Sequence, residues 1–489
     1  MKQHWVTMVV VVTAGSVLLT DAGAAAHTYP AGGAPAASTG GWHTAQQVPG
    51  LAALNTGDFA SVSVVSCASP GDCTATGFYA TSTAEQVFVV NETNRHWGQA
   101  EEVPGLATLD GGNESEVLSL SCASAGNCAA GGTYTSVFGP GEAFVANETN
   151  GTWGTAEEVP GTGTLNASGD AETSSVYCRT AGNCSAGGSY KDGSGNDQAF
   201  VVTETHGTWG TAEEVPGTAA LNTGGRAGVN AVSCPSPGTC SAGGFYAEAP
   251  HPAKHQQAFV VDETNGTWGT AEEVPGIAAL NHGQAGIDSV SCGFAGNCGA
   301  GGSYKASSGG IQAFVVNEIS GTWGSAEEVP GTAALNKGGR AGIGSVSCSF
   351  PSGCSASGEY VGIPGGSLSM LPFVVDETNG TWGTADEIPG IAKLNNDRNS
   401  VVYSLSCAAA ANCSAAGSYQ DASGSSQAFV VNKTDGIWRA AEEIPGLAAL
   451  NVGGAAQANS VSCPGVGRCS AGGSYSASSG VQAFVVNKG

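Results

Sequence analysis

The chain has 489 residues and carries 40 Asp and Glu against 15 Lys and Arg, which gives a formal net charge of −25. Nucleic acids and anionic membrane surfaces are bound through Lys and Arg, so this balance argues against both as partners. The hydrophobic content of 41% is ordinary for a globular protein, whereas 77 glycines predict many tight turns and close backbone contacts.

The N-terminal residues have the pattern of a secretory signal peptide. Lys2 precedes an apolar run over residues 6–19, and the small-residue tract AGAAA follows. We expect cleavage after Ala26, or after Ala24, and then a flexible leader over residues 27–40, which offer no core-forming side chains. No later stretch is apolar enough to cross a membrane, so the sequence predicts an exported protein without membrane insertion.

From Trp42 onward the chain repeats one unit, head to tail, in eight copies. Each copy begins with a tryptophan: Trp42, Trp97, Trp153, Trp209, Trp268, Trp323, Trp382 and Trp438. Internal repeats of this kind are typical of solenoids, propellers and arrays. The eight copies occupy the chain to its last residue and leave no room for a second domain.

Each copy predicts four short antiparallel strands and no helix. Alternating residues such as DSVSC indicate one strand, CSAGGSY a second, AFVV a third and WGTAEEV, ended by Pro-Gly, a fourth. The polar turn NETNGT joins the last two. The repeated Trp, Phe, Tyr and Leu side chains are expected to pack between sheets rather than to form a ligand platform. The repeat is therefore all-β.

Every copy also carries two cysteines with five residues of turn chemistry between them. A hairpin of that size places the two cysteines opposite each other within disulfide reach. A zinc site would need four ligands at close quarters, and each repeat offers two. We expect eight disulfides, formed in an oxidising compartment. The expected pairs are Cys67 and Cys73, Cys122 and Cys128, Cys178 and Cys184, Cys234 and Cys240, Cys292 and Cys298, Cys348 and Cys354, Cys407 and Cys413, and Cys463 and Cys469.

The two ends of the repeat array distinguish a ring from a rod. Residues 41–50 (GWHTAQQVPG) supply a fourth strand without a sheet, and the final AFVVNKG leaves the last copy without its fourth strand. Pairing the two would remove two exposed edges, whereas a linear solenoid would need polar capping repeats. The sequence predicts an all-β, eight-bladed β-propeller of four-stranded antiparallel blades over residues 41–489, closed by the N-terminal strand on the C-terminal blade.

Two short motifs recur in the repeat. They are the glycine doublet that ends the second strand, as at Gly131 and Gly132, and the turn ETNGTW at Glu148–Trp153. Both resemble the kelch repeat, a propeller blade. The sequence departs from kelch in having Val rather than Tyr before the Asn or Asp of that turn, in its cysteine pairs and in its eight copies where six or seven are usual. The chain is also similar to uncharacterised repeat proteins that high-GC, actinobacterial-type bacteria export, which implies a secreted or surface role.

A binding site is expected among residues that are not repeated, because the repeated ones build the blades. The longest loops between second and third strands are Ala247–Gln257 and Val361–Leu371. They should share a face with the blade-to-blade links, and the disulfide turns and NETNGT turns should lie on the opposite face. The candidate ligand-binding residues in these loops and links are His251, Lys254, His255, Ile363, Leu368, Arg226, Arg340 and Arg398.

Metal and catalytic interpretations of these residues are weaker. His251 and His255 have a metal-compatible separation, but they lie on a Pro-containing loop without an obvious third ligand, which favours a solvated loop. The three arginines are similar to the carboxylate-binding cluster of sialidases, yet they belong to different blades and no Tyr/Glu nucleophile pair can be assigned. Calcium is the one cofactor for which the sequence offers candidate ligands. These are the closely spaced side-chain oxygens of Asp110, Asn113, Glu114 and Glu116 in DGGNESE.

Paired acids also recur before the Pro-Gly of seven copies, as at Glu272 and Glu273. Adjacent strand residues point to opposite faces, which is poor geometry for a paired-carboxylate catalyst. Charges on an outermost strand are expected instead to discourage edge-to-edge aggregation.

These observations together predict a secreted, monomeric propeller that is not an enzyme and that recognises a glycan or an extracellular protein. The alternative is a carbohydrate-active enzyme, a hydrolase or lyase, with its site in the central funnel. An unrepeated acid with a perturbed pKa in the funnel would favour the enzyme, and a uniform ring of small polar side chains would favour binding or scaffolding. A structural surface protein without a specific ligand is the third alternative.

Overall fold

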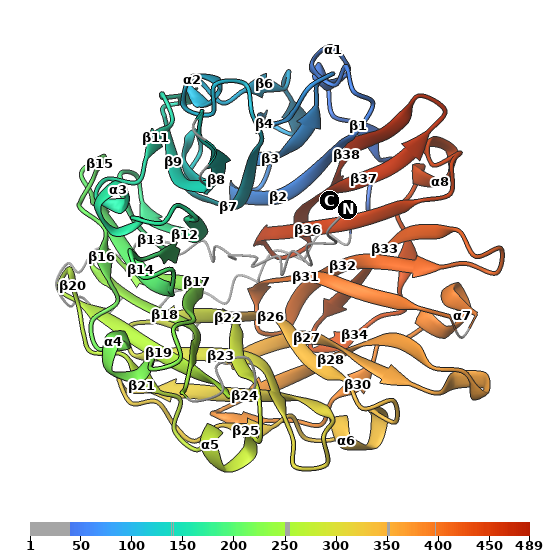
Figure 1. Ribbon diagram of the computed structural model, residues 1–489. Helices are drawn as coiled ribbons and strands as arrows, with labels where there is room; N and C mark the ends of the chain where they lie inside the picture. Colours follow the sequence, from blue (N-terminus) through green and yellow to red (C-terminus); the bar gives the residue numbers. More distant parts are fainter. Residues whose placement is uncertain (1–39, 138, 140, 250–254, 350–352, 397) are drawn as a thin grey trace, which may run out of the picture.

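The computed structural model describes residues 40–489 except 138, 140, 250–254, 350–352 and 397. In this part of the chain, eight antiparallel sheets stand around a central axis as the blades of a propeller (Figure 1). The predicted eight-bladed fold is confirmed. The expected signal peptide and all of the leader but Gly40 lie outside the described residues.

Three long strands form the body of each blade. The innermost strands are β2 (Ala60–Ser69), β7 (Ser115–Ser124), β12 (Glu172–Thr180), β17 (Ala227–Ser236), β22 (Ala285–Phe294), β26 (Ala341–Ser349), β31 (Ser400–Ala409) and β36 (Ala456–Gly465). The second strands are β3 (Asp72–Ala80), β8 (Asn127–Thr135), β13 (Asn183–Lys191), β18 (Thr239–Ala247), β23 (Asn297–Lys305), β27 (Gly353–Gly362), β32 (Asn412–Gln420) and β37 (Arg468–Ala477). The third strands are β4 (Glu85–Thr93), β9 (Gly141–Thr149), β14 (Asp197–Thr205), β19 (Gln256–Thr264), β24 (Ile311–Ile319), β28 (Ser369–Thr378), β33 (Ser426–Thr434) and β38 (Gly480–Lys488).

The outermost strand is broken into short pieces instead of running continuously as predicted. These pieces are β1 (Gln46–Gln47), β5 (His96–Trp97), β6 (Glu101–Glu102), β10 (Thr152–Trp153), β11 (Glu157–Glu158), β15 (Thr208–Trp209), β16 (Glu213–Glu214), β20 (Thr267–Trp268), β21 (Glu272–Glu273), β25 (Glu327–Glu328), β29 (Thr381–Trp382), β30 (Asp386–Glu387), β34 (Ile437–Trp438) and β35 (Glu442–Glu443). The Trp-containing piece and the acidic piece pair with different parts of the same third strand. The second acid of a doublet also has a defined partner: the Tyr246 hydroxyl donates to Glu273 (2.6 Å).

The prediction that no copy contains a helix is wrong, because each blade-to-blade link holds one helical turn. These turns lie at the circumference of the ring (Figure 1): α1 (Leu51–Leu54), α2 (Leu106–Leu109), α3 (Thr162–Leu165), α4 (Thr218–Leu221), α5 (Ile277–Leu280), α6 (Thr332–Leu335), α7 (Ile391–Asn395) and α8 (Leu447–Leu450). The glycine of Pro-Gly reverses the chain at positive φ, as at Gly276 (φ 81°), and the first helical residue, Ile277, is then fully buried. A 3₁₀ turn, η1 (Pro364–Gly366), lies in the β27–β28 loop.

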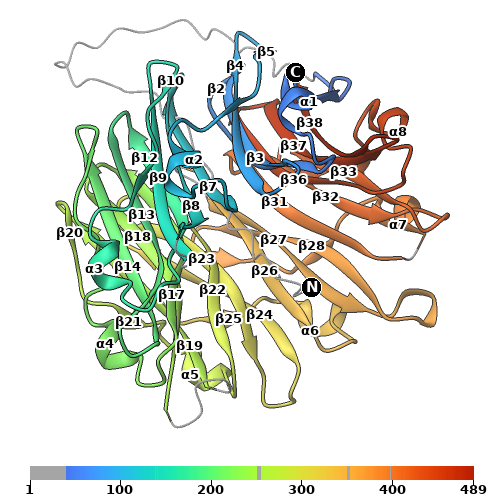
Figure 2. The same cartoon turned by 45° about the horizontal axis from the view of Figure 1, so that its top comes forward.

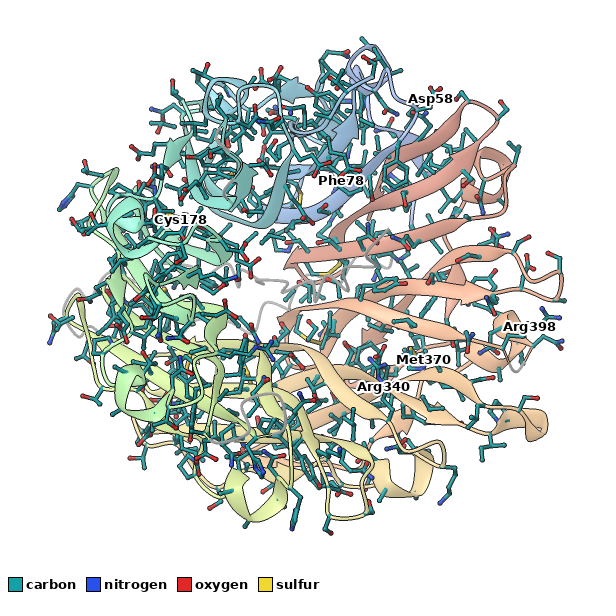
Figure 3. All side chains as sticks on the ribbon, in the orientation of Figure 1. Asp58, Phe78, Cys178, Arg340, Met370 and Arg398 are labelled. Atoms are coloured by element: carbon teal, nitrogen blue, oxygen red, sulfur yellow. A yellow bond between two sulfur atoms is a disulfide. The ribbon has the colours of Figure 1, made fainter. Side chains whose placement is uncertain are left out.

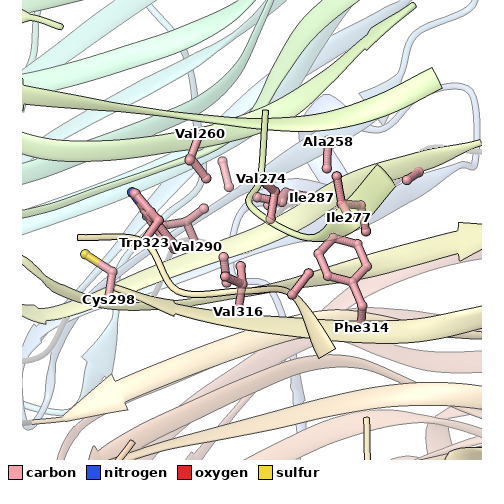
Figure 4. Packing of buried hydrophobic residues seen from close by; sticks show 14 of the residues in the cluster. Ala258, Val260, Val274, Ile277, Ile287, Val290, Cys298, Phe314, Val316 and Trp323 are labelled. Carbon is pink, nitrogen blue, oxygen red and sulfur yellow. The ribbon is translucent and has the colours of Figure 1, made fainter. Parts of the chain in front are cut away.

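Blades pack against each other through the repeated aromatic side chains. In blade 5, Phe314 is fully buried and Trp323 is 5% exposed, and both belong to a cluster that includes Val260 of blade 4 (Figure 4). The phenylalanine at this position is fully buried in every blade: Phe88, Phe144, Phe200, Phe259, Phe314, Phe373, Phe429 and Phe484. Burial of one such side chain contributes about 2 kcal/mol. The predicted packing role of the aromatic residues is therefore confirmed.

The glycine doublet allows two separate close approaches. A Cβ on Gly302 would lie 2.0 Å from the Gly286 carbonyl oxygen of the innermost strand, beside a register shift between Ile287 and Ser289. A Cβ on Gly301 would lie 2.6 Å from Ile343 of the next blade. The first glycine therefore permits contact between blades, and the second permits a bulge within the blade.

All eight predicted disulfides are formed, and no cysteine in the described residues is free. Each joins the innermost strand to the second strand across a hairpin, and Figure 3 draws these bonds in yellow. Beside the cysteines, the serines of the SVSC motif connect neighbouring blades. The backbone N–H of Val346 donates to Ser289 Oγ (3.0 Å), and that of Cys348 donates to Ser291 Oγ (2.9 Å). Because these groups are buried, the hydroxyls satisfy donors that would otherwise have no partner.

Ring closure occurs where the sequence predicts it. Gln46 and Gln47 of β1 pair with Val485 and Phe484 of β38, so the N-terminal strand completes the C-terminal blade. The Ala45 N–H also donates to the Pro445 carbonyl (2.8 Å) in the link from the preceding blade.

The two faces of the ring differ as expected. Isolated parallel bridges, such as Ile311 with Arg340 and Asp197 with Arg226, join the start of a third strand to the link before the next innermost strand. The loops between second and third strands therefore share one face with the links, which we call the link face. The disulfide hairpins and the turns before each Trp lie on the other side, here the disulfide face; the tilted view of Figure 2 separates the two.

Candidate functional site

A central cavity of about 920 Å³ opens on the link face of the ring. The residues that line it come mainly from the starts of the innermost strands, including Ser61, Glu116, Asn230, Tyr403 and Asn459. Alternate residues of a strand point to the same side, so every second residue of these strands faces the axis.

The axis-facing positions hold the residues that vary between repeats. One such position is the fourth residue of the innermost strand, counted from Ala60 in blade 1 and from the matching residue in the other blades. In blades 1 to 8 it holds Ser63, Leu118, Ser174, Asn230, Asp288, Gly344, Tyr403 and Asn459. The second-strand residue between the glycine doublet and the repeated Tyr is Phe78, Thr133, Ser189, Phe245, Ser303, Glu359, Ser418 and Ser474. The residues on the opposite side of the same strands are repeated because they pack between blades. On these strands, the unrepeated residues therefore lie on the side that faces the funnel.

Aromatic side chains from blades 1 and 7 line one part of the cavity. Phe59 and Phe78 lie with ring centroids 5.4 Å apart, and Phe59 is 42% exposed. Tyr403 is half-buried, with its hydroxyl 3.1 Å from Ser418 Oγ. Burial raises the pKa of Tyr403, and the Glu359 charge adds to this shift, whereas the Ser418 contact opposes it. These rings offer flat apolar surface beside the polar side chains of the cavity.

Carboxylates from blades 2 and 3 line another part of the cavity. Burial raises the pKa of Glu116, and the charges of Glu172 and Glu85 raise it further. The pKa of Glu172 is also raised, and burial among the residues of the funnel wall is the largest cause. The Glu172 side chain keeps contact with solvent and accepts a hydrogen bond from Ser174 (3.2 Å). The two acids therefore share a region of negative potential.

Asp288 is an unrepeated acid with a strongly perturbed pKa. It holds the position in β22 that Asn230 and Tyr403, which line the cavity, hold in their own strands. Burial raises the pKa of Asp288 to about 7, and the nearby charge of Glu359 adds to the shift. Glu359 itself lies 3.8 Å from Arg340, which partly offsets the effect of burial on its pKa. At neutral pH, Asp288 is thus poised between its two protonation states.

The three predicted arginines do not form one carboxylate-binding cluster. Arg226 lies 3.9 Å from Asp197 of the preceding blade, and Arg340 pairs with Glu359 of its own blade. Arg398 is exposed and lies toward the circumference of blade 7 (Figure 3). Two of the three are thus held by different acids.

The loop residues are only partly described. His251 and Lys254 lie outside the described residues, and His255 is exposed, with its carbonyl accepting from the Glu248 N–H (2.9 Å). Ile363 and Leu368 are 48% and 67% exposed. The predicted loop at residues 361–371 is shorter than expected, because its two ends continue the β27–β28 ladder.

The four residues of the calcium candidate do not assemble a site. The Asp110 side chain is buried and accepts from the Gly112 N–H (2.7 Å) and from Gln86 (3.1 Å). Asn113 donates to the Asp110 carbonyl, Glu114 is exposed, and Glu116 faces the funnel. Within the residues that the structure describes, no group of three or more His, Cys, Asp or Glu is placed to hold a metal ion.

Comparisons with known proteins find similarity of fold alone. No family model and no curated protein matches the chain. Among solved structures, Sqt1 of Chaetomium thermophilum bound to the N-terminus of the ribosomal protein L10 is 10% identical, with 89% of this chain and 98% of that chain covered and a TM-score of 0.49. An ulvan lyase of polysaccharide lyase family PL25 is 11% identical, with 74% and 90% covered and a TM-score of 0.41. A Hadza microbial sialidase, Hz136, is 12% identical, with 63% of each chain covered and a TM-score of 0.34.

None of the helices in the described part of the chain is long and apolar enough to cross a membrane. The eight disulfides are typical of a protein that folds in an oxidising compartment.

Proposed function

We propose that the protein is an exported, monomeric, kelch-like propeller without catalytic activity that binds a glycan in its funnel. The observation that supports this most is the row of unrepeated residues around the axis, on strands whose opposite sides carry repeated residues. Packing between blades accounts for the repeated positions but not for these unrepeated residues in the funnel wall.

The chemistry of the funnel fits a carbohydrate. The side-chain oxygens of Asn230 and Asn459, the amide of Gln457 and the carboxylate of Glu116 can pair with hydroxyl groups, and Tyr403 can cover the apolar face of a sugar ring. The cavity of about 920 Å³ has room for more than one sugar unit. An extracellular protein segment is the other ligand class that we predict for this face.

Binding to polysaccharides tests the proposal. The chain from residue 27 onward is incubated with a panel of insoluble cell-wall and extracellular polysaccharides, and retention is measured. We then compare Tyr403→Ser and Phe78→Ser, which introduce residues that other repeats carry at these positions, with Val452→Thr, which alters an exposed apolar side chain (68%) in a link. We expect about tenfold weaker retention for each funnel variant, equivalent to about 1.4 kcal/mol, and no change for Val452→Thr. Failure to retain any polymer would contradict glycan binding.

A carbohydrate-active enzyme is the second candidate, and Asp288 favours it. An acid with a pKa of about 7, next to a second carboxyl group at Glu359, can donate or accept a proton at neutral pH. The same polysaccharides are therefore assayed for released reducing ends and for unsaturated products. Product formation by the intact protein that is lost in Asp288→Asn would establish the enzyme in place of the binding module.

A further inference from the structure

The disulfide face carries a cluster of cations at the seam where the ring closes. Each third strand of blades 1 to 6 has a buried glutamate near its end: Glu92, Glu148, Glu204, Glu263, Glu318 and Glu377. Blades 7 and 8 carry Lys433 and Lys488 instead. The charge at this position is therefore reversed in blades 7 and 8, the last two blades before the ring closes onto blade 1.

Further departures from the repeat add cations at the same place. Arg439 follows Trp438 in blade 7, whereas glycine follows the tryptophan in blades 1 to 6. Arg468 of blade 8 occupies a position at which most blades have Asn, Asp or Thr. Arg95 replaces the glycine of the NETNGT turn and keeps the positive φ of that turn (69°). A non-glycine residue in this conformation costs roughly 1 kcal/mol or more. His43 and His96 are also unrepeated and lie at this seam.

These residues line two adjoining pockets between blades. The pocket between blades 7 and 8, of about 420 Å³, is lined by Lys433, Arg439 and Lys488. The pocket between blades 8 and 1, of about 320 Å³, is lined by Lys488, Arg468 and Arg95. Lys488 lines both pockets, so they lie next to each other at blade 8, and we call the pair the seam cleft.

Pockets of the same kind lie between other blades, so the seam cleft differs from them in its charge and not in its presence. The pocket between blades 5 and 6 is lined by Glu318 and Glu377, and the pocket between blades 1 and 2 by Asp72 and Glu92. The seam cleft therefore has the same architecture with the opposite sign of charge, in a protein of net charge −25. It holds 5 of the 15 Lys and Arg residues of the chain, namely Arg95, Lys433, Arg439, Arg468 and Lys488.

Internal partners neutralise only part of this charge. Lys433 lies 2.8 Å from Asp376, whereas the ammonium of Lys488 donates to the side-chain oxygen of Asn432 (2.7 Å) and lies 6.0 Å from the centre of the Trp42 ring. Two of the side chains that line the cleft are carboxylates. They are Glu442, which accepts from Asn432 Nδ2 (3.2 Å), and the buried Glu92, which accepts from Asn487 and Ser470.

The two arginines of the second pocket share an oxygen acceptor. The guanidinium groups of Arg95 and Arg468 both donate to the main-chain oxygen of Gly489, the last residue of the sequence, the latter at 2.7 Å. A guanidinium has five N–H donors, and these contacts use one on each side chain. The remaining donors can serve an oxyanion.

We propose that the seam cleft binds an anionic glycan, a chain of sugars that carries carboxylate or sulfate groups. Two neighbouring pockets that share Lys488 fit successive anionic units better than a single small ion. A protein partner would bring apolar anchor residues, but among the side chains that line the cleft in the described chain, Val466 is the one large apolar side chain that is exposed (38%). This site lies on the face opposite the funnel and does not depend on the function proposed above.

Substitutions that restore the repeat test this site with little risk to the fold. In Arg95→Gly/Arg439→Gly, both positions take the residue that most other blades carry, and the first change also relieves the positive φ. The matched control, Lys337→Thr/Lys393→Ala, likewise restores repeat residues and removes the same charge, at exposed positions in links. Tyr403→Ser serves as the funnel variant.

Binding of polygalacturonate and of dextran sulfate is measured by calorimetry at low ionic strength, with neutral dextran and poly-L-glutamate as comparators. We expect the intact chain to bind at least one of the two anionic glycans, and neutral dextran and poly-L-glutamate at least fivefold more weakly. The carboxylate and sulfate polymers distinguish the two oxyanions. Arg95→Gly/Arg439→Gly should bind at least fivefold more weakly with an unchanged melting temperature, while the control and Tyr403→Ser bind normally.

Each opposite result overturns the proposal. Absence of binding to both anionic glycans, or an equal loss in Lys337→Thr/Lys393→Ala, would show that the cleft is no site. Equal binding of poly-L-glutamate would replace the glycan with an acidic peptide. Loss of binding in Tyr403→Ser alone would assign the anionic glycan to the funnel.

Discussion

Two buried glutamates on the disulfide face link the stability of the protein to pH. Glu204 and Glu318 are 2% and 4% exposed, and burial raises the pKa of each to about 7, with further contributions from Glu157 and Asp262 respectively. In both side chains Oε2 has no hydrogen-bond partner. Neutral carboxyl groups fit this environment better than carboxylates do.

These pKa values predict that the protein gains stability as the pH falls. The folded-state pKa lies above the unfolded value of 4.5, so the stabilisation is fully present below about 4.5 and is lost as the pH rises through 7. Each shift corresponds to about 3 kcal/mol at most. Chemical denaturation should give a larger free energy of unfolding at pH 5 than at pH 7.5. The double variant Glu204→Gln/Glu318→Gln should reduce this difference, and an equal pH dependence in the variant would assign the effect to the overall charge instead.

Within one blade, the second glycine of the doublet decides whether the innermost strand can bulge. Gly302→Ala would place a methyl group 2.0 Å from the Gly286 carbonyl oxygen, so strand β22 or β23 must shift. We expect a loss of about 2 kcal/mol or more in the free energy of unfolding. Gly344→Ala is the matched control, because nothing lies within 4 Å of its Cβ position, and it should change stability by less than about 0.5 kcal/mol. Equal effects of the two variants would contradict the steric argument.

An element could be predicted from the sequence when the interactions that stabilise it join residues close together in the chain. The hairpins and disulfides were correct because the paired cysteines are separated by six positions, so nearby residues alone determine their geometry. The helical turn at Ile277 was missed because four residues give no helical periodicity, and the turn is stabilised by burial of its first side chain between blades. The second serine of each SVSC motif has its partner in the next blade, which no strand pattern reveals.

At the scale of the whole molecule, strand β1 holds the ring closed. Deletion of residues 41–48 would remove the pairs that Gln46 and Gln47 form with β38 and expose that strand as an open edge. We expect a lower midpoint of thermal unfolding and association through the free edge, detected by calorimetry and by light scattering. A synthetic peptide of residues 41–50 should restore the midpoint and the monomer. An unchanged midpoint and a monomeric deletion variant would show that closure contributes little.

The candidate sites were only partly visible in the sequence. Unrepeated residues were expected to mark a site. Phe59, Glu116 and Tyr403 were nevertheless recognisable as cavity-lining residues only once the strands were placed around an axis. The longest loops were predicted to bind the ligand because loop length can be read directly from the sequence. The departures at Arg95 and Arg439 are readable in an alignment of the repeats, yet nothing local shows that they meet.

The sequence by itself determined the repeat, the blade count, the disulfide pairing and the closure of the ring, because each follows from short-range patterns or from matching a missing strand with a spare one. Only the tertiary structure decided which side chains share a cavity. Closure brings together residues almost 400 positions apart, as where the Trp97 indole N–H donates to Asn487 (3.1 Å), and neither partner carries a local signal for the other. The funnel and the seam cleft are products of that long-range contact.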